Sequence, residues 1–190
     1  MATRTGSTSA LVVVDVQVGV VANAFDRDPI VQNVALAVER ARSAGAPVIW
    51  VQHHDEELQR DTPAWQWTQP LQPMDGEPRI YKQFNSSFED TPLLEVLDQL
   101  KVAHIVLAGA ASNWCIRATA YGALERGFDL TLVGDAHTTE DMQLGPGATV
   151  EAKSIIEDLN MAMRWLSYPG RKNNVVNAAD LVFRAQPFVT

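Results

Sequence analysis

Three polar residues able to do nucleophilic chemistry each stand at the end of a short apolar run. Asp15 follows LVVV, Lys82 follows RIY, and Cys115, the single cysteine, follows IVLAG and the loop 110–114. If these runs are parallel strands of one sheet, their carboxyl ends share an edge, and open α/β sheets form their sites there. The spacing therefore predicts a site with a thiol, a carboxylate and an ammonium group.

Each of the three residues also has a structural explanation. A lone cysteine is usually a small buried hydrophobic residue, Asp15 could be a helix cap or one half of a salt bridge, and most strand-end lysines are solvated. Together they favour catalysis, because a carboxylate can accept the thiol proton while an ammonium group stabilises the thiolate. We expect Lys82 and the start of the next helix to lower the pKa of Cys115.

Two periodicities alternate along the chain and indicate how these residues are positioned. Short runs rich in Val, Ile and Leu are typical of buried strands, and they occur at 10–14, 47–52, 104–109 and 129–134, with weaker candidates at 79–82 and 175–176. Helical patterns lie between them, at 28–44, 91–100, 115–126 and 148–166. The alternation predicts an α/β fold with a mostly parallel sheet.

Composition restricts the class of protein. A chain of 190 residues with 46% hydrophobic residues fits one domain, which we place at 10–190 after a flexible tail at 1–9. One cysteine excludes an internal disulfide, a CxxC pair and a four-thiolate zinc site. The net charge of −8 argues against nucleic-acid binding, and no apolar run suits a signal peptide or a membrane span. We expect a cytoplasmic protein without nucleic-acid or membrane partners.

One long connection, 55–78, interrupts the alternation. It contains four prolines and the tryptophans Trp65 and Trp67. A connection this long in a compact domain is usually functional or disordered, and two tryptophans argue against disorder. The tryptophans either fill a gap or a subunit interface, or they form one wall of a pocket. Both interpretations stay open at this point.

Four motifs, in this order and spacing, resemble the isochorismatase-like cysteine hydrolase superfamily, which includes nicotinamidases and N-carbamoylsarcosine amidase. They are VVVDVQ at 12–17, YKQFNSSFEDTPLLEVL at 81–97, IVLAGAASNWCIRATAYGAL at 105–124 and LTLVGDAHTT at 130–139. The resemblance implies a three-layer α-β-α fold around a six-stranded parallel sheet of order 3-2-1-4-5-6. It also implies that Asp15 is the base, Lys82 its partner and Cys115 the nucleophile.

The resemblance further implies an oxyanion hole made by the N–H groups of Ala111 and Cys115, beside a non-proline cis peptide between residues 110 and 111. It also implies a homo-oligomer, a dimer or larger. Nicotinamidases carry metal ligands after the second strand, but this chain has His53, His54 and Asp55 there and no further histidine before His104. The chain therefore lacks a ligand set, and we expect no metal and no cofactor.

Substrate contacts are predicted from residue type and position. We expect Gln17 to form a hydrogen bond in the site wall rather than to lie in a surface turn. The pocket is expected to suit a mid-sized apolar or aromatic group, with lining residues Trp65, Trp67, Phe84, Phe88 and Trp114. Trp114 could instead pack beneath the helix. His137 could form a Cys–His dyad, which is a second nucleophilic arrangement.

The sequence thus predicts a hydrolase that cleaves an amide-type C–N bond of a small molecule through a thioester. Isochorismatases proper, which cleave a vinyl ether, resemble this fold but typically lack the cysteine, so Cys115 favours C–N hydrolysis. Vinyl-ether hydrolysis remains an alternative, as does a non-catalytic small-molecule binding module on the same fold.

Overall fold

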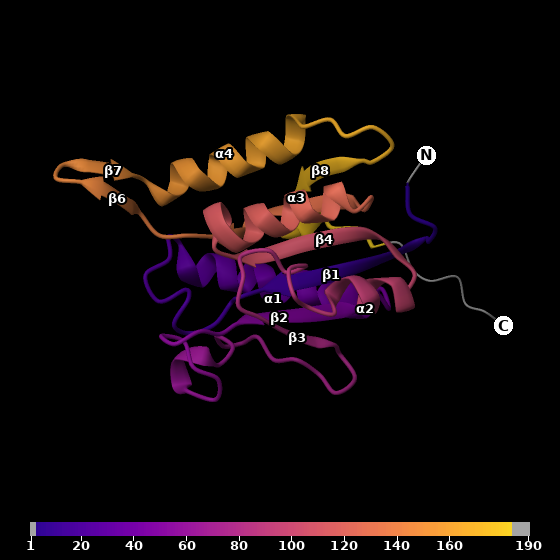
Figure 1. The fold of residues 1–190 in the computed structure, drawn as a ribbon, viewed down its shortest axis with the longest axis horizontal. Coiled ribbons are helices and arrows are strands. Elements are labelled where there is room, and N and C mark those ends of the chain that lie inside the picture. The colour runs from indigo at the N-terminus through magenta and orange to yellow at the C-terminus, as the bar shows by residue number, and fades with distance from the viewer. Residues whose placement is uncertain (1–2, 184–190) are drawn as a thin grey trace.

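The computed structural model describes residues 3–183, built around a six-stranded parallel sheet (Figure 1). The strands are β1 (Thr8–Val14), β2 (Val48–His53), β3 (Arg79–Lys82), β4 (Val102–Ala110), β5 (Asp129–Thr138) and β8 (Asn173–Val176). Their order is β3-β2-β1-β4-β5-β8, and every neighbouring pair is parallel. The predicted α/β fold and strand order are confirmed, with β8 as the sixth strand of the sheet.

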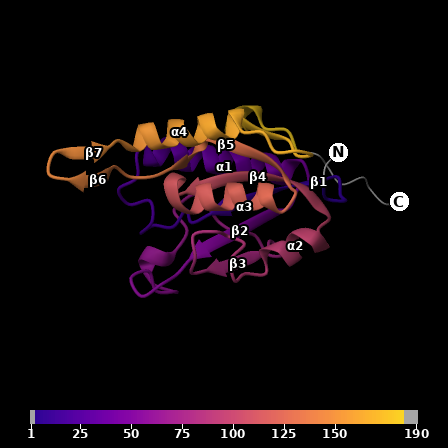
Figure 2. The same ribbon diagram turned by 45° about the horizontal axis from the view of Figure 1, so that its top comes forward.

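Both faces of the sheet are covered by helices, which explains why its strands are continuous apolar runs. All seven residues of β1 are buried. One face packs against α1 (Arg27–Ser43), and the other packs against α2 (Leu93–Gln99), α3 (Arg117–Glu125) and α4 (Ala152–Trp165) (Figures 1 and 2). No helix among residues 3–183 is long and apolar enough to cross a membrane.

The strand order places a topological switch point between β1 and β4. From β1 the chain goes outward to β2 and β3, and it then returns to β4 and continues to β5 and β8. Connections therefore diverge at the carboxyl ends of β1 and β4, which leaves a crevice in doubly wound sheets. Asp15 and the loop before Cys115 follow these two strands directly.

The helix predicted at 148–166 begins later than expected. Residues 142–150 instead form a two-stranded antiparallel hairpin, β6 (Met142–Gly145) and β7 (Ala148–Val150), which projects from the body in Figure 1. Gly145 and Gly147 have φ of 151° and 76°, which glycine adopts readily and a helix does not permit. Asp141 Oδ1 accepts a hydrogen bond from the Ala152 N–H at 2.8 Å, and this contact fixes the true helix start.

Three further boundaries differ from the prediction. The flexible tail was predicted to extend to residue 9, but Thr8 and Ser9 already belong to β1 and are buried beside β4. Strand β5 continues beyond the predicted end at Gly134 as far as Thr138. The helix predicted at 115–126 is preceded by a π-helical turn, Ser112–Ile116, so α3 itself starts at Arg117.

Candidate active site

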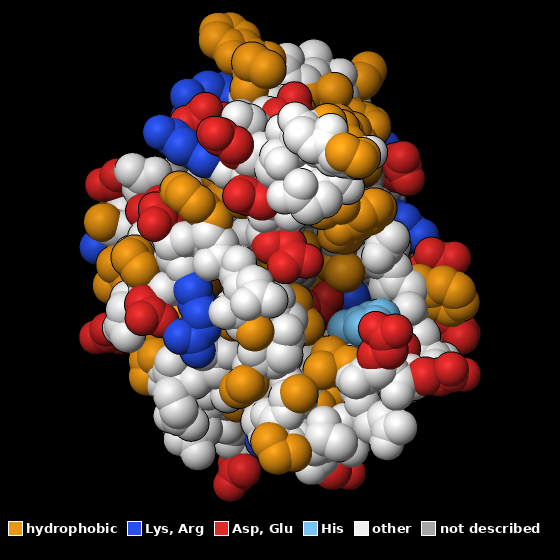
Figure 3. Space-filling model, turned by 90° about the vertical axis from the view of Figure 1, so that its left-hand side faces the viewer, with side chains coloured by type: hydrophobic (Ala, Val, Ile, Leu, Met, Phe, Trp, Pro, Cys, Tyr) orange, Lys and Arg blue, Asp and Glu red, His pale blue; other side chains and the backbone are white. Residues whose placement is uncertain are grey.

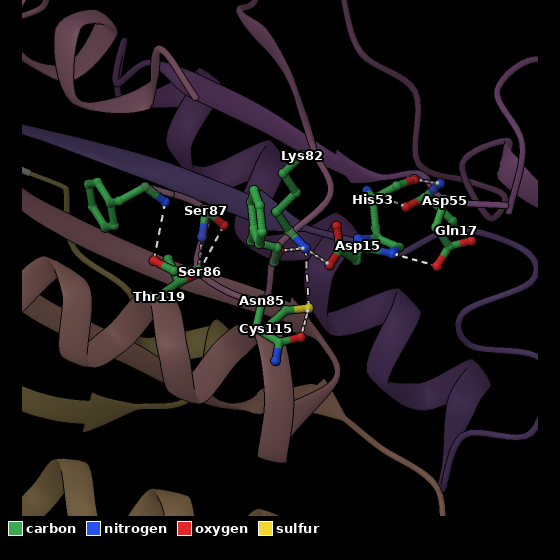
Figure 4. Close-up of polar contacts among 12 residues, drawn as sticks. Asp15, Gln17, His53, Asp55, Lys82, Asn85, Ser86, Ser87, Cys115 and Thr119 are labelled. Carbon is green, nitrogen blue, oxygen red and sulfur yellow. Dashed lines mark hydrogen bonds and ion pairs between the residues drawn. The ribbon is translucent and has the colours of Figure 1, made fainter. Parts of the chain in front are cut away.

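The three residues singled out from the sequence meet at the carboxyl edge of the sheet (Figure 4). Lys82 Nζ lies 2.6 Å from Asp15 Oδ2 and 3.2 Å from Cys115 Sγ. Because β2 separates β3 from β1, Lys82 needs its long side chain to reach across the end of that strand. One ammonium group thus contacts both the carboxylate and the thiol.

Local backbone geometry brings Asp15 beside the loop that carries Cys115. A Cβ at Gly109, whose φ is 131°, would lie 1.9 Å from the Val14 carbonyl oxygen, so β1 and β4 approach closely only because this residue is glycine. Asp15 has a left-handed backbone with φ 52°, a conformation that aspartate tolerates better than most residues. Strand β1 therefore ends at the point where the carboxylate enters the site.

Asp15 and Lys82 form a buried ion pair. The Asp15 side chain is 1% exposed and that of Lys82 is fully buried. Burial alone would lower the pKa of Lys82, but the charges of Asp15 and Cys115 outweigh it and raise the pKa overall. Lys82 Nζ also donates a hydrogen bond to the Phe84 carbonyl at 3.2 Å. The ammonium group is therefore held as a cation between its two partners.

The surroundings of Cys115 favour the protonated thiol over the thiolate. Burial raises its pKa to about 12, the charge of Asp15 adds to this effect, and Lys82 opposes it without reversing it. The expectation of a lowered thiol pKa is therefore wrong, because partial burial of Cys115 and the nearby Asp15 carboxylate outweigh Lys82, and α3 begins only at Arg117. Ionisation of Cys115 requires a nearby group that takes its proton.

The loop before Cys115 has the implied backbone geometry. The peptide bond between Ala110 and Ala111 is cis, as predicted. In the π-helical turn that follows, the N–H groups of Trp114 and Ile116 both donate to the Ala111 carbonyl at 3.1 Å. Ala111 and Cys115 are thus held in one compact turn.

Three of the aromatic residues predicted to line the pocket lie on segments next to Lys82 and Cys115. Phe84 and Trp114 are 46% and 50% exposed, so their rings are available to a ligand. Phe88 is 7% exposed, and its ring stacks on Phe128 in the core with centroids 6.1 Å apart. Contact of Phe88 with a substrate stays a prediction.

Gln17 holds the long connection after β2 in place. Its buried side chain accepts a hydrogen bond from the His53 N–H at 2.9 Å and donates to the carbonyls of His53 and Trp65 at 3.1 and 3.0 Å. Trp65 is 8% exposed, and Trp67 packs edge-on against Trp50 with centroids 4.8 Å apart. These contacts indicate that the tryptophans fill a gap, and contact of Gln17, Trp65 or Trp67 with a substrate stays a prediction.

A hollow on the face shown in Figure 3 exposes acidic, basic and histidine side chains together. At this edge of the sheet, His53 lies opposite Lys82 in the β2–β3 register, and its Nε2 is 2.9 Å from Asp55 Oδ2. Within residues 3–183, no group of three or more His, Cys, Asp or Glu side chains is placed to hold a metal ion. His53 and Asp55 are thus paired with each other.

The alternative Cys–His dyad is wrong. His137 is buried, with Nδ1 2.8 Å from Ser112 Oγ and Nε2 3.1 Å from Asn160 Oδ1. Both ring nitrogens are therefore occupied by partners other than Cys115. Burial also lowers the pKa of His137 to about 4, which keeps the ring neutral.

Sequence reasoning did not identify Asn85. Its Oδ1 lies 3.9 Å from Cys115 Sγ, which makes it a weak partner of the thiol (Figure 4). Behind it, the hydroxyl of Thr119 donates to that of Ser87 at 2.9 Å and ties this loop to α3. Polar residues are common in loops, so the only usable signal was the position of Asn85 shortly after Lys82 in the same motif.

The isochorismatase domain model matches residues 9–154, which is more than half of the chain. The chain belongs to the isochorismatase family. The match includes Asp15, Lys82 and Cys115, and it confirms the resemblance on which the strand order and the cis peptide were predicted.

Similarity to members of the isochorismatase family extends beyond this domain model. The chain is 35% identical over 184 residues to streptothricin hydrolase from Streptomyces noursei, covering 94% of this chain and 72% of that one. It is 26% identical over 180 residues to ureidoacrylate amidohydrolase RutB from Cronobacter sakazakii, covering 73% and 76%. A solved isochorismatase from Pseudomonas putida superposes with a TM-score of 0.83 and 27% identity, covering 93% and 91%.

Proposed function

We propose that this protein hydrolyses an amide-type C–N bond of a small molecule through a thioester on Cys115. The observation that carries the proposal is the position of Lys82 Nζ, 2.6 Å from Asp15 Oδ2 and 3.2 Å from Cys115 Sγ. A nucleophile, a base and a cation within contact distance are the parts that nucleophilic catalysis needs. Relatives named as a hydrolase and an amidohydrolase support the C–N bond as the target.

The first half of the reaction forms the thioester. As Cys115 Sγ attacks the carbonyl carbon, its proton passes to Asp15, and the N–H groups of Ala111 and Cys115 stabilise the oxyanion. Asp15 then gives this proton to the leaving nitrogen as the C–N bond breaks. The amine or ammonia departs, and the acyl group remains on sulfur.

The second half consumes one water molecule. Asp15 accepts a proton from water as the water oxygen attacks the thioester carbonyl. Collapse of the second tetrahedral intermediate breaks the C–S bond, the acid leaves, and the proton on Asp15 returns to sulfur. One carboxylate thus serves as base and acid in turn, which fits a site whose resting thiol is protonated.

Lys82 supplies charge rather than protons. Its ammonium group stabilises the thiolate as it forms and holds the Asp15 carboxylate in place. Because the pair is buried, this electrostatic effect is stronger than it would be in water. The raised pKa of Lys82 keeps the group charged through the cycle.

The exposed rings of Phe84 and Trp114 support a substrate with a mid-sized apolar or aromatic group. This preference is separable from the chemistry. Wild-type rates on benzamide-like and formamide-like amides should differ, with the aromatic amides faster.

The proposal is tested by screening purified protein against small amides and scoring ammonia release. We expect Cys115→Ser and Lys82→Met to lose at least about 10²-fold in kcat. Lys153→Met is the matched control, because this lysine side chain is 65% exposed and should leave the rate unchanged. Intact-mass spectrometry of the working enzyme should show an acyl adduct on Cys115 that hydroxylamine removes. Amide turnover that survives in Cys115→Ser at the wild-type rate would contradict the mechanism.

A further inference from the structure

The end of β5 is fastened to the loop that carries the nucleophile. In the β4–β5 register, Gly109 pairs with His137 and Ala110 pairs with Thr138. Just beyond, the Thr139 hydroxyl donates a 2.7 Å hydrogen bond to Asn113 Oδ1. The extension of β5 past Gly134 therefore runs alongside the turn that holds Cys115.

A buried hydrogen bond between His137 and Ser112 also joins β5 to this turn, and its direction follows from the partner of the other ring nitrogen. Asn160 Nδ2 donates to the Gly134 carbonyl at 2.9 Å, so Asn160 Oδ1 is the atom that faces His137 Nε2. That oxygen can only accept, so Nε2 carries the proton. In a neutral ring Nδ1 is then an acceptor, and the Ser112 hydroxyl must donate to it at 2.8 Å.

A buried chain of hydrogen bonds thus runs from α4 through β5 to the nucleophile loop. Ser112 and His137 are both completely buried, so water does not compete for these bonds. Ser112 is also the first residue of the π-helical turn and follows Ala111 directly. A shift of Ser112 would move the N–H of Ala111 and the thiol of Cys115 relative to each other.

We propose that His137 is a positioning residue for the hydrolysis: through Ser112 it fixes the turn that aligns Cys115 with Ala111. This inference rests on the proposed function of Cys115. A misplacement of about 1 Å at a reacting group can cost about 10²-fold in rate, which makes such a contact measurable.

The chain offers a comparison at the amino ends of β1 and β4. His104 in β4 also bonds a serine, with Nδ1 2.8 Å from Ser9 Oγ and Nε2 2.8 Å from Thr131 Oγ1. Ser9 is buried in β1 at the amino end of the strands, away from Cys115. Ser9→Ala and Ser112→Ala therefore each remove a serine–histidine contact, a part-buried one and a buried one, but only Ser112 adjoins the nucleophile.

The test compares Ser112→Ala, His137→Gln and Ser9→Ala in three measurements: thermal unfolding, steady-state kinetics on an amide found by the screen, and alkylation of Cys115 by iodoacetamide. We expect Ser112→Ala to lower kcat about 10²-fold with little change in KM. Ser9→Ala should also lose stability but keep its kcat. Alkylation of Cys115 at pH 8 should rise about tenfold in Ser112→Ala and in His137→Gln but not in Ser9→Ala, because a loosened turn exposes the thiol further.

Two results would overturn the inference. One is a kcat for Ser112→Ala equal to that of Ser9→Ala, and the other is an unchanged alkylation rate of Cys115 in Ser112→Ala. If His137→Gln fails to fold, Ser112→Ala still decides, because it removes one hydroxyl and leaves the ring in place. Alkylation needs no amide substrate, so a wild-type protein that hydrolyses no amide yet shows the alkylation difference would refute the proposed function and leave the positioning intact.

Discussion

At the residue scale, the proton of Cys115 is the centre of the chemistry. A single buried carboxylate both raises the pKa of the thiol and is the proposed acceptor of its proton. These two effects are compatible, because the thiol needs to ionise only when a carbonyl carbon is in place to receive its electrons.

Asp15→Asn separates the two effects of this carboxylate. The substitution keeps a residue that tolerates the left-handed backbone and removes the charge. Because that charge raises the pKa of Cys115, we expect the variant to react with iodoacetamide about tenfold faster at pH 8 while amide hydrolysis is lost. Intact-mass spectrometry measures the alkylation.

Asp28→Asn serves as the control for this comparison, since its side chain is 81% exposed and lies outside the site. It should match the wild type in alkylation and in hydrolysis. An Asp15→Asn variant that alkylates no faster than wild type would contradict the electrostatic account of the thiol. Loss of one partner leaves Lys82 buried without its counter-ion, so the fold of the variant needs checking by circular dichroism.

At the element scale, the close contact of β1 with β4 sets the distance between base and nucleophile. Gly109→Ala would place a methyl group 1.9 Å from the Val14 carbonyl oxygen, at a φ of 131° that side chains rarely adopt. We expect the free energy of unfolding to fall by about 3 kcal/mol or more, since the strands must separate. Urea unfolding followed by fluorescence measures the change.

The comparison for this variant is Gly147→Ala in the β6–β7 hairpin. Gly147 also has a positive φ, 76°, but a Cβ there would meet nothing within 4 Å. The free energy of unfolding of this variant should fall only by the cost of backbone strain, about 1 kcal/mol. Equal losses in the two variants would show that the contact between β1 and β4 is not the reason for the glycine.

At the scale of the whole molecule, His137 couples stability to pH. The pKa of His137 is about 4 in the folded protein against a usual value of 6.5. Between these two pH values the ring is mostly protonated in the unfolded chain and mostly neutral in the folded protein. The stability this ring contributes is present above pH 6.5 and is lost as the pH falls toward 4, about 3 kcal/mol in all.

Urea unfolding at pH 7.5 and at pH 4.5 tests this coupling. In the wild type the free energy of unfolding should be lower at pH 4.5 than at pH 7.5. We expect this difference to be much smaller in His137→Gln. His54→Gln is the comparison: burial lowers the pKa of His54 too, but its side chain is only half-buried, so this variant should reduce the difference less than His137→Gln does. If the free energy of unfolding of His137→Gln depends on pH as strongly as that of the wild type, His137 is not the cause of the pH dependence.

Also at this scale, we predict that the protein is a homo-oligomer, a dimer or larger. Several large apolar side chains are exposed on α4 and the β6–β7 hairpin, among them Leu144 at 70%, Met161 at 58% and Trp165 at 78%. Large apolar side chains left exposed along α4 and the hairpin are candidates for burial against a second copy of the chain. Light scattering after size exclusion should give at least twice the chain mass of 20.9 kDa, and a single-chain mass at micromolar concentration would contradict the prediction.

The sequence alone determined the sheet and the residues at its edge. Buried parallel strands must be apolar throughout, so β1, β2, β4 and β5 stood out, and polar residues shortly after such runs were the candidates for the site. Asp15 and Cys115 followed from this, Lys82 came from the weaker run at 79–82, and the family resemblance supplied the strand order and the cis peptide. The hairpin at 142–150 was misjudged because the helical pattern predicted over 148–166 does not show where glycines turn the chain.

Only the tertiary structure decided the protonation and support of these residues. The raised pKa of Cys115 depends on burial and on a charge that lies a hundred residues away in the chain, and composition carries no measure of either. The bond from His137 to Ser112 likewise joins residues whose pairing depends on how far β5 extends beside β4. Residue type and spacing determine which groups are available, and three-dimensional packing determines their charge and their partners.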